Sequence, residues 1–316
     1  GTLDKLESIP GFRTDLSEGR FKQLVETLGL ALIGQTAEIA PADKRLYALR
    51  DVTGTVSSIP LITSSIMSKK LAEGLDALVL DVKVGSGAFM KTLPEARDLA
   101  RHMVEVGERM GKAMVALITD MSQPLGQAVG NANEVVESIQ ILRGEGPADV
   151  RALTLALAQE MLTLGGVDPA EAERALDDGR ALEKFREIIE AQGGDPRVCD
   201  DPLAVLPKAA HTEPFLAERD GFVAEVDCTS VGVGALLLGA GRLKTTDPVD
   251  PAVGLTVLKR LGDPVQAGEP LALIHHNDRN LALARQRLGR AWRIGDTAPA
   301  QPPLIHDRLA RDAAAH

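Results

Sequence analysis

The segment from Asp76 to about Thr119 constrains the fold most, because it is patterned as a strand, a helix and a second strand. Residues 77–82 form a short, mostly apolar run rich in β-formers, which is typical of a buried strand. Thr92-Leu-Pro-Glu95 matches a capping box, and the apolar residues after it recur at helical spacing. Residues 113–118 supply the next strand. Because such units cross over with a right hand, we predict a parallel α/β sheet.

Two loops of this unit are expected to meet. Residues 85–91 and 119–128 both leave the carboxyl ends of the predicted parallel strands, so they belong to one rim of the sheet. Open α/β sheets bind ligands at that rim. We therefore expect the functional site there.

The remaining elements are predicted from shorter patterns. A helix is expected from about Glu18 to Leu28, followed by a short strand at residues 30–33. Residues 42–72 are compatible with helix over most of their length, and they lie between the potential hinges Ala40-Pro41 and Glu73-Gly74. Residues 134–192 have a helical pattern with stops at Gly144 and Gly165.

The chain beyond Pro207 has a different texture. Residues 215–219 and 222–226 flank Asp220-Gly221, which predicts a β-hairpin. Residues 262–274 have the turn-and-strand pattern of biotinyl- and lipoyl-like barrel sandwiches. The polar, Ala-rich tail after Ile305 is expected to be loosely held.

These patterns predict an α/β fold built from three parts. The parts are an α/β domain with a mixed or parallel sheet, a segment of a helical lobe, and a C-terminal α+β subdomain of barrel-sandwich type. The predicted limits are 1–33 and 76–206 for the α/β domain, 42–72 for the helical segment and 207–316 for the C-terminal subdomain.

The composition excludes several classes of protein. Lys and Arg number 35 against 45 Asp and Glu, so the net charge is −10, and no basic cluster offers a nucleic-acid surface. No apolar run reaches the roughly 18–20 residues of a membrane span, and the first residues lack the pattern of a signal peptide. Two cysteines are too few for a disulfide framework. A cytoplasmic protein without nucleic-acid or membrane partners is predicted.

Residues 47–70 contain the strongest candidate site. Ser65 and Lys69 are four residues apart and share a helix face, and Arg50 lies upstream. Such donors can bind a planar ligand that has carbonyl oxygens and a ring N–H. In the other interpretation Lys69 extends into water and Ser65 bonds its own backbone, and spacing alone favours this one.

Other candidate motifs are weaker. Gly85-Ser-Gly-Ala-Phe89 follows a predicted strand, as a phosphate-binding turn would, but it matches neither a dinucleotide fingerprint nor a P-loop. An ordinary tight turn explains it equally well. No Ser-His-Asp set can be assembled from the sequence.

Several long motifs follow one another in a specific order. They are Gly1-Thr-Leu-Asp-Lys-Leu-Glu7, Arg50-Asp-Val-Thr-Gly-Thr55, Ser64-Ser-Ile-Met-Ser-Lys-Lys70, Asp81-Val-Lys-Val-Gly-Ser-Gly-Ala-Phe-Met-Lys91 and Pro124-Leu-Gly126. With this set the sequence resembles the pyrimidine-nucleoside phosphorylase family, and within it the thymidine phosphorylases, over nearly the whole chain.

The resemblance implies reversible phosphorolysis of thymidine to thymine and 2-deoxy-α-D-ribose 1-phosphate. Negative charge builds on the departing pyrimidine, and cationic donors lower the barrier by binding that anion better than the neutral base. By this resemblance, Arg50 and Lys69 act near the base oxygen O4 and Ser65 near N3.

The resemblance also implies roles for other residues. Thr2 corresponds to a phosphate contact, and the apolar walls around the base correspond to Tyr47, Ile62, Ile66 and Phe89. Apolar residues at helical spacing are also ordinary core residues. A potassium site of some members corresponds to the backbone carbonyls of Leu125 and Ala128 together with Glu137. No cofactor is required, and phosphate is a co-substrate.

Family members carry a Lys-His-Ser segment and a Gly-rich phosphate loop upstream of the residue that corresponds to Thr2. The resemblance therefore implies a chain that is incomplete at its N-terminus, with a base half-site, a partial phosphate site and little activity alone. It also implies a homodimer for the full-length family, with the helical lobe at the interface.

Four alternatives remain at this point. One is anthranilate phosphoribosyltransferase, which shares the two-lobe plan, although the sequence has no acidic Mg²⁺ motif. A second is a pyrimidine-nucleoside phosphorylase that also accepts uridine, against which Phe89 argues modestly. A third is a carrier-type binding module, but Lys259 in Leu258-Lys-Arg260 lacks the setting of a modified lysine. The last is a non-catalytic fragment.

Overall fold

The folded chain consists of two compact units. The computed structural model describes residues 1–34, 42–43, 58–244 and 246–310. Unit 1 comprises Gly1–Gly34, Ser122–Arg151 and Glu173–Gln301, and unit 2 comprises Gln35–Met121, Ala152–Ala172 and Pro302–His316. The domain limits drawn from the sequence group the chain differently and stay a prediction.

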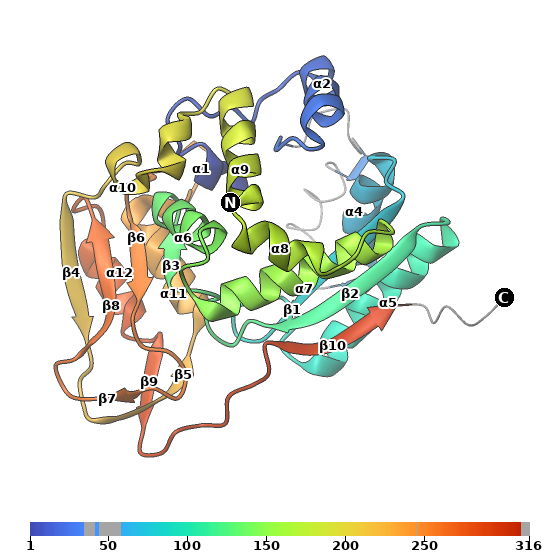
Figure 1. Ribbon diagram of the computed structural model, residues 1–316. Coiled ribbons are helices and arrows are strands. Elements are labelled where there is room, and N and C mark those ends of the chain that lie inside the picture. The colour runs from blue at the N-terminus through green and yellow to red at the C-terminus, as the bar shows by residue number, and fades with distance from the viewer. Residues whose placement is uncertain (35–41, 44–57, 245, 311–316) are drawn as a thin grey trace. The chain divides into compact units, whose positions relative to one another are not determined.

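The centre of unit 2 is the predicted strand, helix and strand. These elements are β1 (Ala77–Val84), α5 (Leu93–Arg109) and β2 (Ala113–Asp120). β1 and β2 pair in parallel from Ala77 opposite Ala113 to Val84 opposite Asp120, which confirms the parallel pairing. α5 packs on one face of the two strands (Figure 1). Alternate strand residues such as Val82 and Ile118 join its apolar stripe.

The start of α5 is fixed by the predicted capping box. Thr92 Oγ1 accepts a hydrogen bond from the Glu95 N–H, and the Glu95 carboxylate accepts one from the Thr92 N–H at 3.0 Å. Hydrogen bonds from the Thr92 and Lys91 N–H groups hold the pKa of Glu95 below its ordinary value. The capping box therefore forms as predicted.

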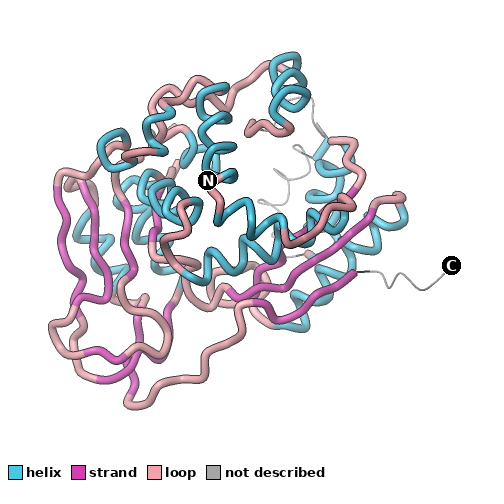
Figure 2. The backbone as a smooth tube through the Cα atoms, viewed as in Figure 1, coloured by secondary structure: helices cyan, strands magenta, loops and turns pink. Residues whose placement is uncertain are grey.

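The tail after Ile305 is not loosely held as far as residue 310, so that prediction was wrong. Residues Ile305–Ala310 form β10, which pairs antiparallel with β2 and completes a sheet in the order β1-β2-β10 (Figure 2). Arg308 forms an ion pair with Glu160 at 2.6 Å, and Asp307 pairs with Arg97 at 2.8 Å. Pairing with the edge of β2 and these ion pairs order the segment despite its polar composition.

The helices of the two units lie largely where the sequence predicts them. The predicted helix at residues 18–28 is α2, and Gly144 and Gly165 follow helix ends as predicted. Besides α5, the described residues outside the C-terminal part form the helices α1 (Thr2–Leu6), α2 (Glu18–Leu28), α4 (Ile59–Ala72), α6 (Ala132–Leu142), α7 (Ala148–Leu164), α8 (Glu171–Asp177), α9 (Arg180–Ala191), η1 (Pro196–Cys199) and α10 (Pro202–Val205).

The strand predicted at residues 30–33 is absent, since these residues are irregular. The side-chain amide of Gln192 takes the place of a strand partner. Its Nε2 donates to the Leu32 carbonyl at 2.8 Å, and its Oε1 accepts from the Leu32 N–H at 2.9 Å. Leu30 and Leu32 pack against a small core with Ile9, so their apolarity reflects burial in an extended segment.

The C-terminal part of unit 1 is a sandwich of two small sheets around one core. The sheets have the orders β3-β6-β8-β4 and β7-β5-β9. Their strands, with the accompanying helices, are β3 (Ala128–Gly130), β4 (His211–Leu216), β5 (Gly221–Val226), α11 (Cys228–Ala235), η2 (Leu236–Ala240), β6 (Gly254–Val257), β7 (Pro264–Val265), β8 (Pro270–His276), α12 (Leu281–Leu288) and β9 (Trp292–Gly295).

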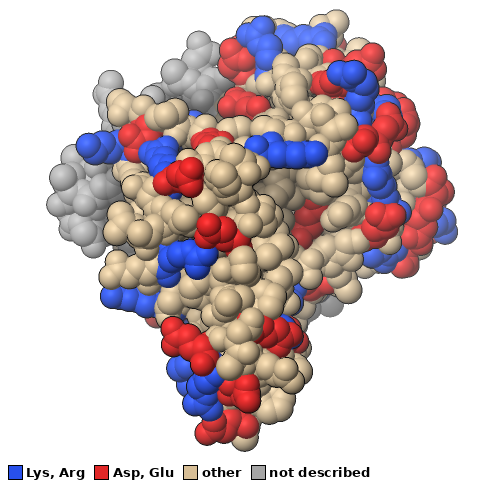
Figure 3. All heavy atoms as spheres, turned by 90° about the vertical axis from the view of Figure 1, so that its left-hand side faces the viewer, with Lys and Arg blue, Asp and Glu red and all other residues tan. Residues whose placement is uncertain are grey.

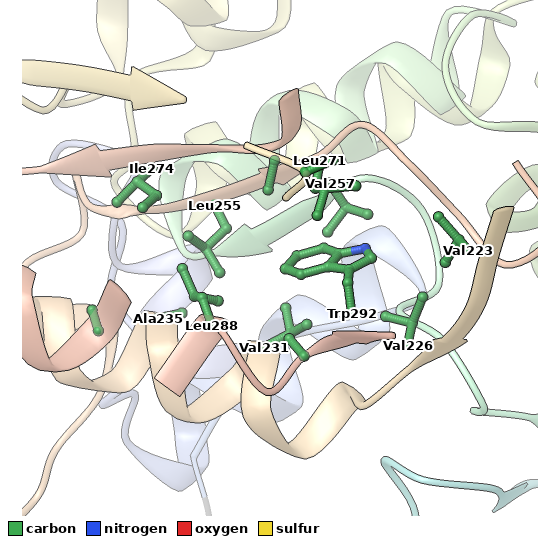
Figure 4. Packing of buried hydrophobic residues seen from close by; sticks show 14 of the residues in the cluster. Val223, Val226, Val231, Ala235, Leu255, Val257, Leu271, Ile274, Leu288 and Trp292 are labelled. Carbon is green, nitrogen blue, oxygen red and sulfur yellow. The ribbon is translucent and has the colours of Figure 1, made fainter. Parts of the chain in front are cut away.

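Trp292 lies inside this core. Among the buried side chains around it are Val231 from α11, Leu255 and Val257 from β6, and Leu271 from β8 (Figure 4). The predicted α+β subdomain of barrel-sandwich type is present, and with the mixed sheet of unit 2 it confirms the α/β fold class.

The hairpin predicted across Asp220-Gly221 does not form. β4 pairs with β8, whereas β5 pairs with β7 and β9, so the two strands belong to different sheets. The segment that follows β4 is hydrogen-bonded to the loop before β8: the Ala217 N–H donates to Glu269 O at 2.8 Å. The turn residues were recognised correctly, but the turn connects two sheets.

Charges of both signs are intermixed on the face of the molecule in Figure 3, where no basic stripe gathers. None of the helices in the described part of the chain combines the length and the apolarity that a membrane crossing needs.

Candidate active site

α4 carries the helical half of the candidate site. Pro60 occupies its first turn, where a missing N–H costs nothing, and Lys69 and Lys70 lie in the last turn, where cations face the negative end of the helix dipole. Thr63, Ser65 and Met67 are buried. Ser65 is therefore an interior hydroxyl on a well-formed helix.

Ser65, Lys69 and Asp43 form one polar cluster in unit 2. Lys69 Nζ donates to Ser65 Oγ at 3.0 Å and to Asp43 Oδ2 at 2.7 Å. The side chains of Lys69 and Asp43 are only 27% and 11% exposed. Lys69 thus does not simply extend into water, and Ser65 contacts the ammonium as the helical spacing suggested.

The cluster leaves Lys69 with capacity for a ligand. An ammonium group has three N–H donors, and among the described residues Ser65 and Asp43 take two of them. The third can be donated to an oxygen of a bound molecule. Asp43 was not identified from the sequence, because it lies 26 positions before Lys69 and no local pattern links the two.

The other residues assigned to the base pocket have varied environments. Arg50 and Tyr47 lie outside the described residues. Ile62 and Ile66 are partly buried and pack against the core beneath α4, so they serve as core residues at least in part. Phe89 is 72% exposed in the loop after β1, which leaves its ring available to cover a ligand.

Within unit 2, the start of the second rim loop meets the first, as predicted. The Met121 N–H donates to Val84 O at 2.7 Å, and the Gly87 N–H donates to Met121 O at 3.0 Å. The loop that carries Phe89 is therefore held by the first residue after β2. The loop 85–90 itself closes through a bond from the Gly85 N–H to Met90 O at 3.1 Å.

A second polar cluster lies where β1 and β2 approach this rim. Lys83 Nζ forms an ion pair with Asp81 at 2.7 Å and donates to Thr119 Oγ1 at 3.0 Å. Lys83 lies opposite Thr119 in the parallel register, and Asp81 precedes it on the same face. The alternation of the strand could have revealed this cluster, but the sequence reasoning treated residues 77–82 as an apolar run.

Thr2, assigned to phosphate, lies in unit 1. It is exposed at the start of α1. Two positions further on, Asp4 pairs with Arg242 at 2.8 Å. This pair fixes α1 to a segment of the C-terminal part of unit 1.

The residues assigned to potassium also lie in unit 1. Glu137 Oε1 accepts hydrogen bonds from the N–H groups of Gln127 and Ala128, at 2.7 and 3.0 Å. Burial raises the pKa of Glu137 against these two bonds, and the nearby carboxylates Glu134 and Asp149 raise it further. Among the described residues, no basic side chain forms an ion pair with Glu137, and no group of three or more His, Cys, Asp or Glu side chains could hold a metal ion.

Comparison with known proteins gives two family matches along the chain. Residues 1–182 match the glycosyl transferase family a/b domain, and residues 222–295 match the pyrimidine nucleoside phosphorylase C-terminal domain. The chain is 48% identical to pyrimidine-nucleoside phosphorylase of Geobacillus stearothermophilus, over 98% of this chain and 73% of that protein.

The chain belongs to the pyrimidine-nucleoside phosphorylase family. Two further proteins named pyrimidine-nucleoside phosphorylase have similar identity and coverage. That of Bacillus subtilis (strain 168) is 49% identical over 97% of this chain and 72% of that protein, and that of Staphylococcus aureus (strain COL) is 47% identical over the same shares.

Family membership bears on two of the alternatives that the sequence left open. The match at residues 222–295 is to a phosphorylase domain, which argues against anthranilate phosphoribosyltransferase. The barrel sandwich also does not present Lys259 as a biotin or lipoate carrier domain presents its modified lysine. Lys259 is tied to Glu269 at 2.5 Å and donates to Pro264 O at 3.0 Å, so it is not a free lysine at a hairpin tip.

Proposed function

We propose that this phosphorylase converts thymidine and phosphate reversibly into thymine and 2-deoxy-α-D-ribose 1-phosphate. The observation that carries the proposal is the Lys69 ammonium, which Ser65 and Asp43 hold at 3.0 and 2.7 Å in a largely buried position. A cation held in this way suits a site where a pyrimidine leaves with negative charge.

In this reaction a phosphate oxygen attacks the anomeric carbon of the sugar from the face opposite the base. The new C–O bond forms as the bond to N1 of the base breaks, and the electron pair of that bond stays with the pyrimidine. The charge spreads onto the carbonyl oxygens and ring nitrogens of the base. Lys69 donates its remaining hydrogen bond to O4, and Ser65 interacts with N3, so both bind the departing anion better than the neutral base.

Asp43 supports this role by anchoring Lys69. A lysine side chain has about 2 kcal/mol of rotamer entropy to lose when it is fixed. The contact with Asp43 fixes the ammonium before substrate arrives, so less of that entropy is lost in the transition state. Arg50 acts beside Lys69 at O4, and Thr2 contacts phosphate. The base is lined by Tyr47, Ile62, Ile66 and Phe89.

A broader specificity is the second candidate function. The relatives from Geobacillus stearothermophilus and Bacillus subtilis carry the name pyrimidine-nucleoside phosphorylase, which is not restricted to thymidine. This favours an enzyme that also accepts uridine. By the family resemblance, Phe89 beside the base modestly favours the narrower choice, and its ring is exposed.

Both candidates are tested by one assay on the enzyme. Thymidine or uridine is mixed with phosphate, and the products are followed by ³¹P NMR. We expect a sugar 1-phosphate of α configuration to appear in step with thymine, and kcat/KM for thymidine to exceed that for uridine at least about tenfold, a difference of 1.4 kcal/mol. Equal values would establish the broader specificity, and release of free deoxyribose would contradict phosphorolysis.

We also propose a potassium site formed by the carbonyls of Leu125 and Ala128 and the carboxylate of Glu137. The donor set is all oxygen, as hard cations prefer. In the described part of the chain, the Leu125 carbonyl accepts no hydrogen bond and Glu137 has no cationic partner. A bound cation would supply the charge that this half-buried carboxylate lacks and would order the loop after β2.

The potassium site predicts a specific effect of the cation on thermal stability. KCl is expected to raise the Tm of the wild type more than NaCl or choline chloride at equal ionic strength, because a ligand that binds the folded state stabilises it. Glu137→Gln should abolish the difference between the salts. Glu134→Gln, on the same helix, serves as the control. Equal Tm values of the wild type in all three salts would rule the site out.

A further inference from the structure

We propose that Arg260 and Asp149 are positioning residues that fix the loop of residues 123–128, which carries the two carbonyls of the proposed potassium site. Arg260 lies in the C-terminal sandwich, after β6, and is far from the loop in sequence. The proposal rests on the proposed function for the role of the loop, but the contacts themselves do not depend on it.

The guanidinium of Arg260 binds the loop at several points. It donates to the carbonyls of Pro124 and Gly126, at 3.1 and 3.4 Å, and to Gln123 Oε1 at 3.4 Å. The Leu261 N–H donates to the same Gln123 oxygen at 3.0 Å. All of these donors belong to Arg260 and Leu261, so these two adjacent residues hold the loop in one conformation.

Asp149 completes the arrangement from α7. Its carboxylate forms an ion pair with Arg260 at 2.6 Å and accepts a hydrogen bond from the Gly126 N–H at 3.1 Å. Burial acts to raise the pKa of Asp149, but the bonds from Arg260 and Gly126 outweigh it, and the pKa lies below the ordinary value. Asp149 is therefore ionised at neutral pH, and the pair holds both the N–H and the carbonyl of Gly126.

The loop has little room to adopt another conformation. Gly126 has a φ of +71°, and a Cβ added there would lie 2.3 Å from Glu137 Oε2 and 2.8 Å from a methyl group of Val150. The next residue is held as well, since Gln127 O accepts from the Val257 N–H at 2.8 Å. Leu125 is left between fixed neighbours, with its carbonyl unbonded in the described part of the chain.

The same loop follows β2 directly in the chain. Met121, the residue before the loop, accepts a hydrogen bond from the Gly87 N–H and so holds the Phe89 loop within unit 2. Arg260 acts through the loop, as a positioning residue.

The test compares Arg260 with an arginine in a similar setting elsewhere in unit 1. Arg186 pairs with Asp200 at 2.7 Å, donates to the Pro196 carbonyl at 3.1 Å, and is 25% exposed, against 24% for Arg260. Arg260→Lys and Arg186→Lys keep the charge but remove the planar fork that binds several oxygens at once. Asp149→Asn is a second variant in case Arg260→Lys folds poorly.

Two readouts are measured on each variant of the enzyme. Hydrogen exchange of the amides of residues 126–128 reports on the loop, and steady-state kinetics with thymidine and phosphate report on the activity. For Arg260→Lys and Asp149→Asn we expect exchange at least tenfold faster in the loop. We also expect kcat to fall about 10- to 100-fold, since small displacements of catalytic groups have effects of this size. Arg186→Lys should leave both readouts within twofold of the wild type.

The outcomes separate this proposal from the proposed function. Unchanged loop exchange in both variants would overturn the positioning role, and so would faster exchange with unchanged kcat. If both readouts move as expected while KCl has no specific effect on the wild type, the potassium site fails and Arg260 keeps its role. A wild type that releases deoxyribose by hydrolysis would refute the proposed function, while the exchange data would still report on the loop.

Discussion

Replacing Lys69 by alanine in the full-length enzyme is expected to lower kcat for thymidine phosphorolysis by about 100- to 1,000-fold, the usual loss when one donor to a developing anion is removed. KM should change far less, because the neutral base of the ground state gains little from the cation. The expectation follows from the geometry of the cluster, in which Ser65 and Asp43 hold the ammonium so that one N–H remains for the leaving base.

Lys70 provides the control for this experiment. It is the next residue on α4, but it forms an exposed pair with Glu73. Lys70→Ala should leave kcat within about twofold, since exposed ion pairs contribute little. Because Lys69→Ala leaves the Asp43 carboxylate without its cation, folding is checked by circular dichroism, and Lys69→Ala/Asp43→Asn is measured beside the single variant. Similar kcat values for Lys69→Ala and Lys70→Ala would contradict the assigned role.

Trp292→Ala is expected to reduce the free energy of unfolding by about 3–5 kcal/mol, as large-to-small changes in packed cores do. The indole fills the centre of the sandwich between the two sheets (Figure 4). Its Nε1–H also donates to the Lys259 carbonyl at 3.0 Å, and the variant leaves that acceptor unpaired. Urea unfolding followed by far-ultraviolet circular dichroism measures the loss, because the chain has a single tryptophan and the variant has none.

Arg293 is the matched control on the same strand. Its side chain points to the surface, where it pairs with Glu225. Arg293→Ala should change the free energy of unfolding by less than about 1 kcal/mol, the range measured for exposed ion pairs. A loss below about 1 kcal/mol for Trp292→Ala would show that the sandwich does not depend on this residue.

The predictable parts of the fold are those in which local signals agree with one another. Between Ala77 and Asp120, apolar runs, a capping box and helical periodicity all point to one crossover unit, and the structure contains it. The glycine stops at Gly144 and Gly165 were equally local. The sheet rim followed from topology alone, because parallel strands place their carboxyl ends together.

The errors occurred where a distant partner decides the structure. Leu32 is bonded by the side chain of Gln192, 160 residues away, in place of a neighbouring strand. Ile305–Ala310 becomes a strand only because β2 offers it an edge. The turn at Asp220-Gly221 was recognised, but the partners of β4 and β5 come from later parts of the chain. Local composition does not contain this information.

The candidate site shows the same division. Helical spacing places Ser65 and Lys69 on one face, but spacing alone favoured the other interpretation, and the family resemblance was needed to assign them to the base. Asp43 and Arg260 were missed, since each reaches its partners across many residues. The roles given to Arg50 and Tyr47 still rest on the family resemblance, as these residues lie outside the described part of the chain.

The most direct measurement of the leaving-group role compares Lys69→Ala with the wild type on pyrimidine deoxynucleosides whose bases differ in acidity. A more acidic base, such as 5-fluorouracil, leaves with less help. If Lys69 binds the departing anion, the loss of kcat in Lys69→Ala should shrink steadily from thymidine to 5-fluoro-2′-deoxyuridine, because less charge stabilisation is needed. A loss of the same size for every base would contradict the role assigned to Lys69.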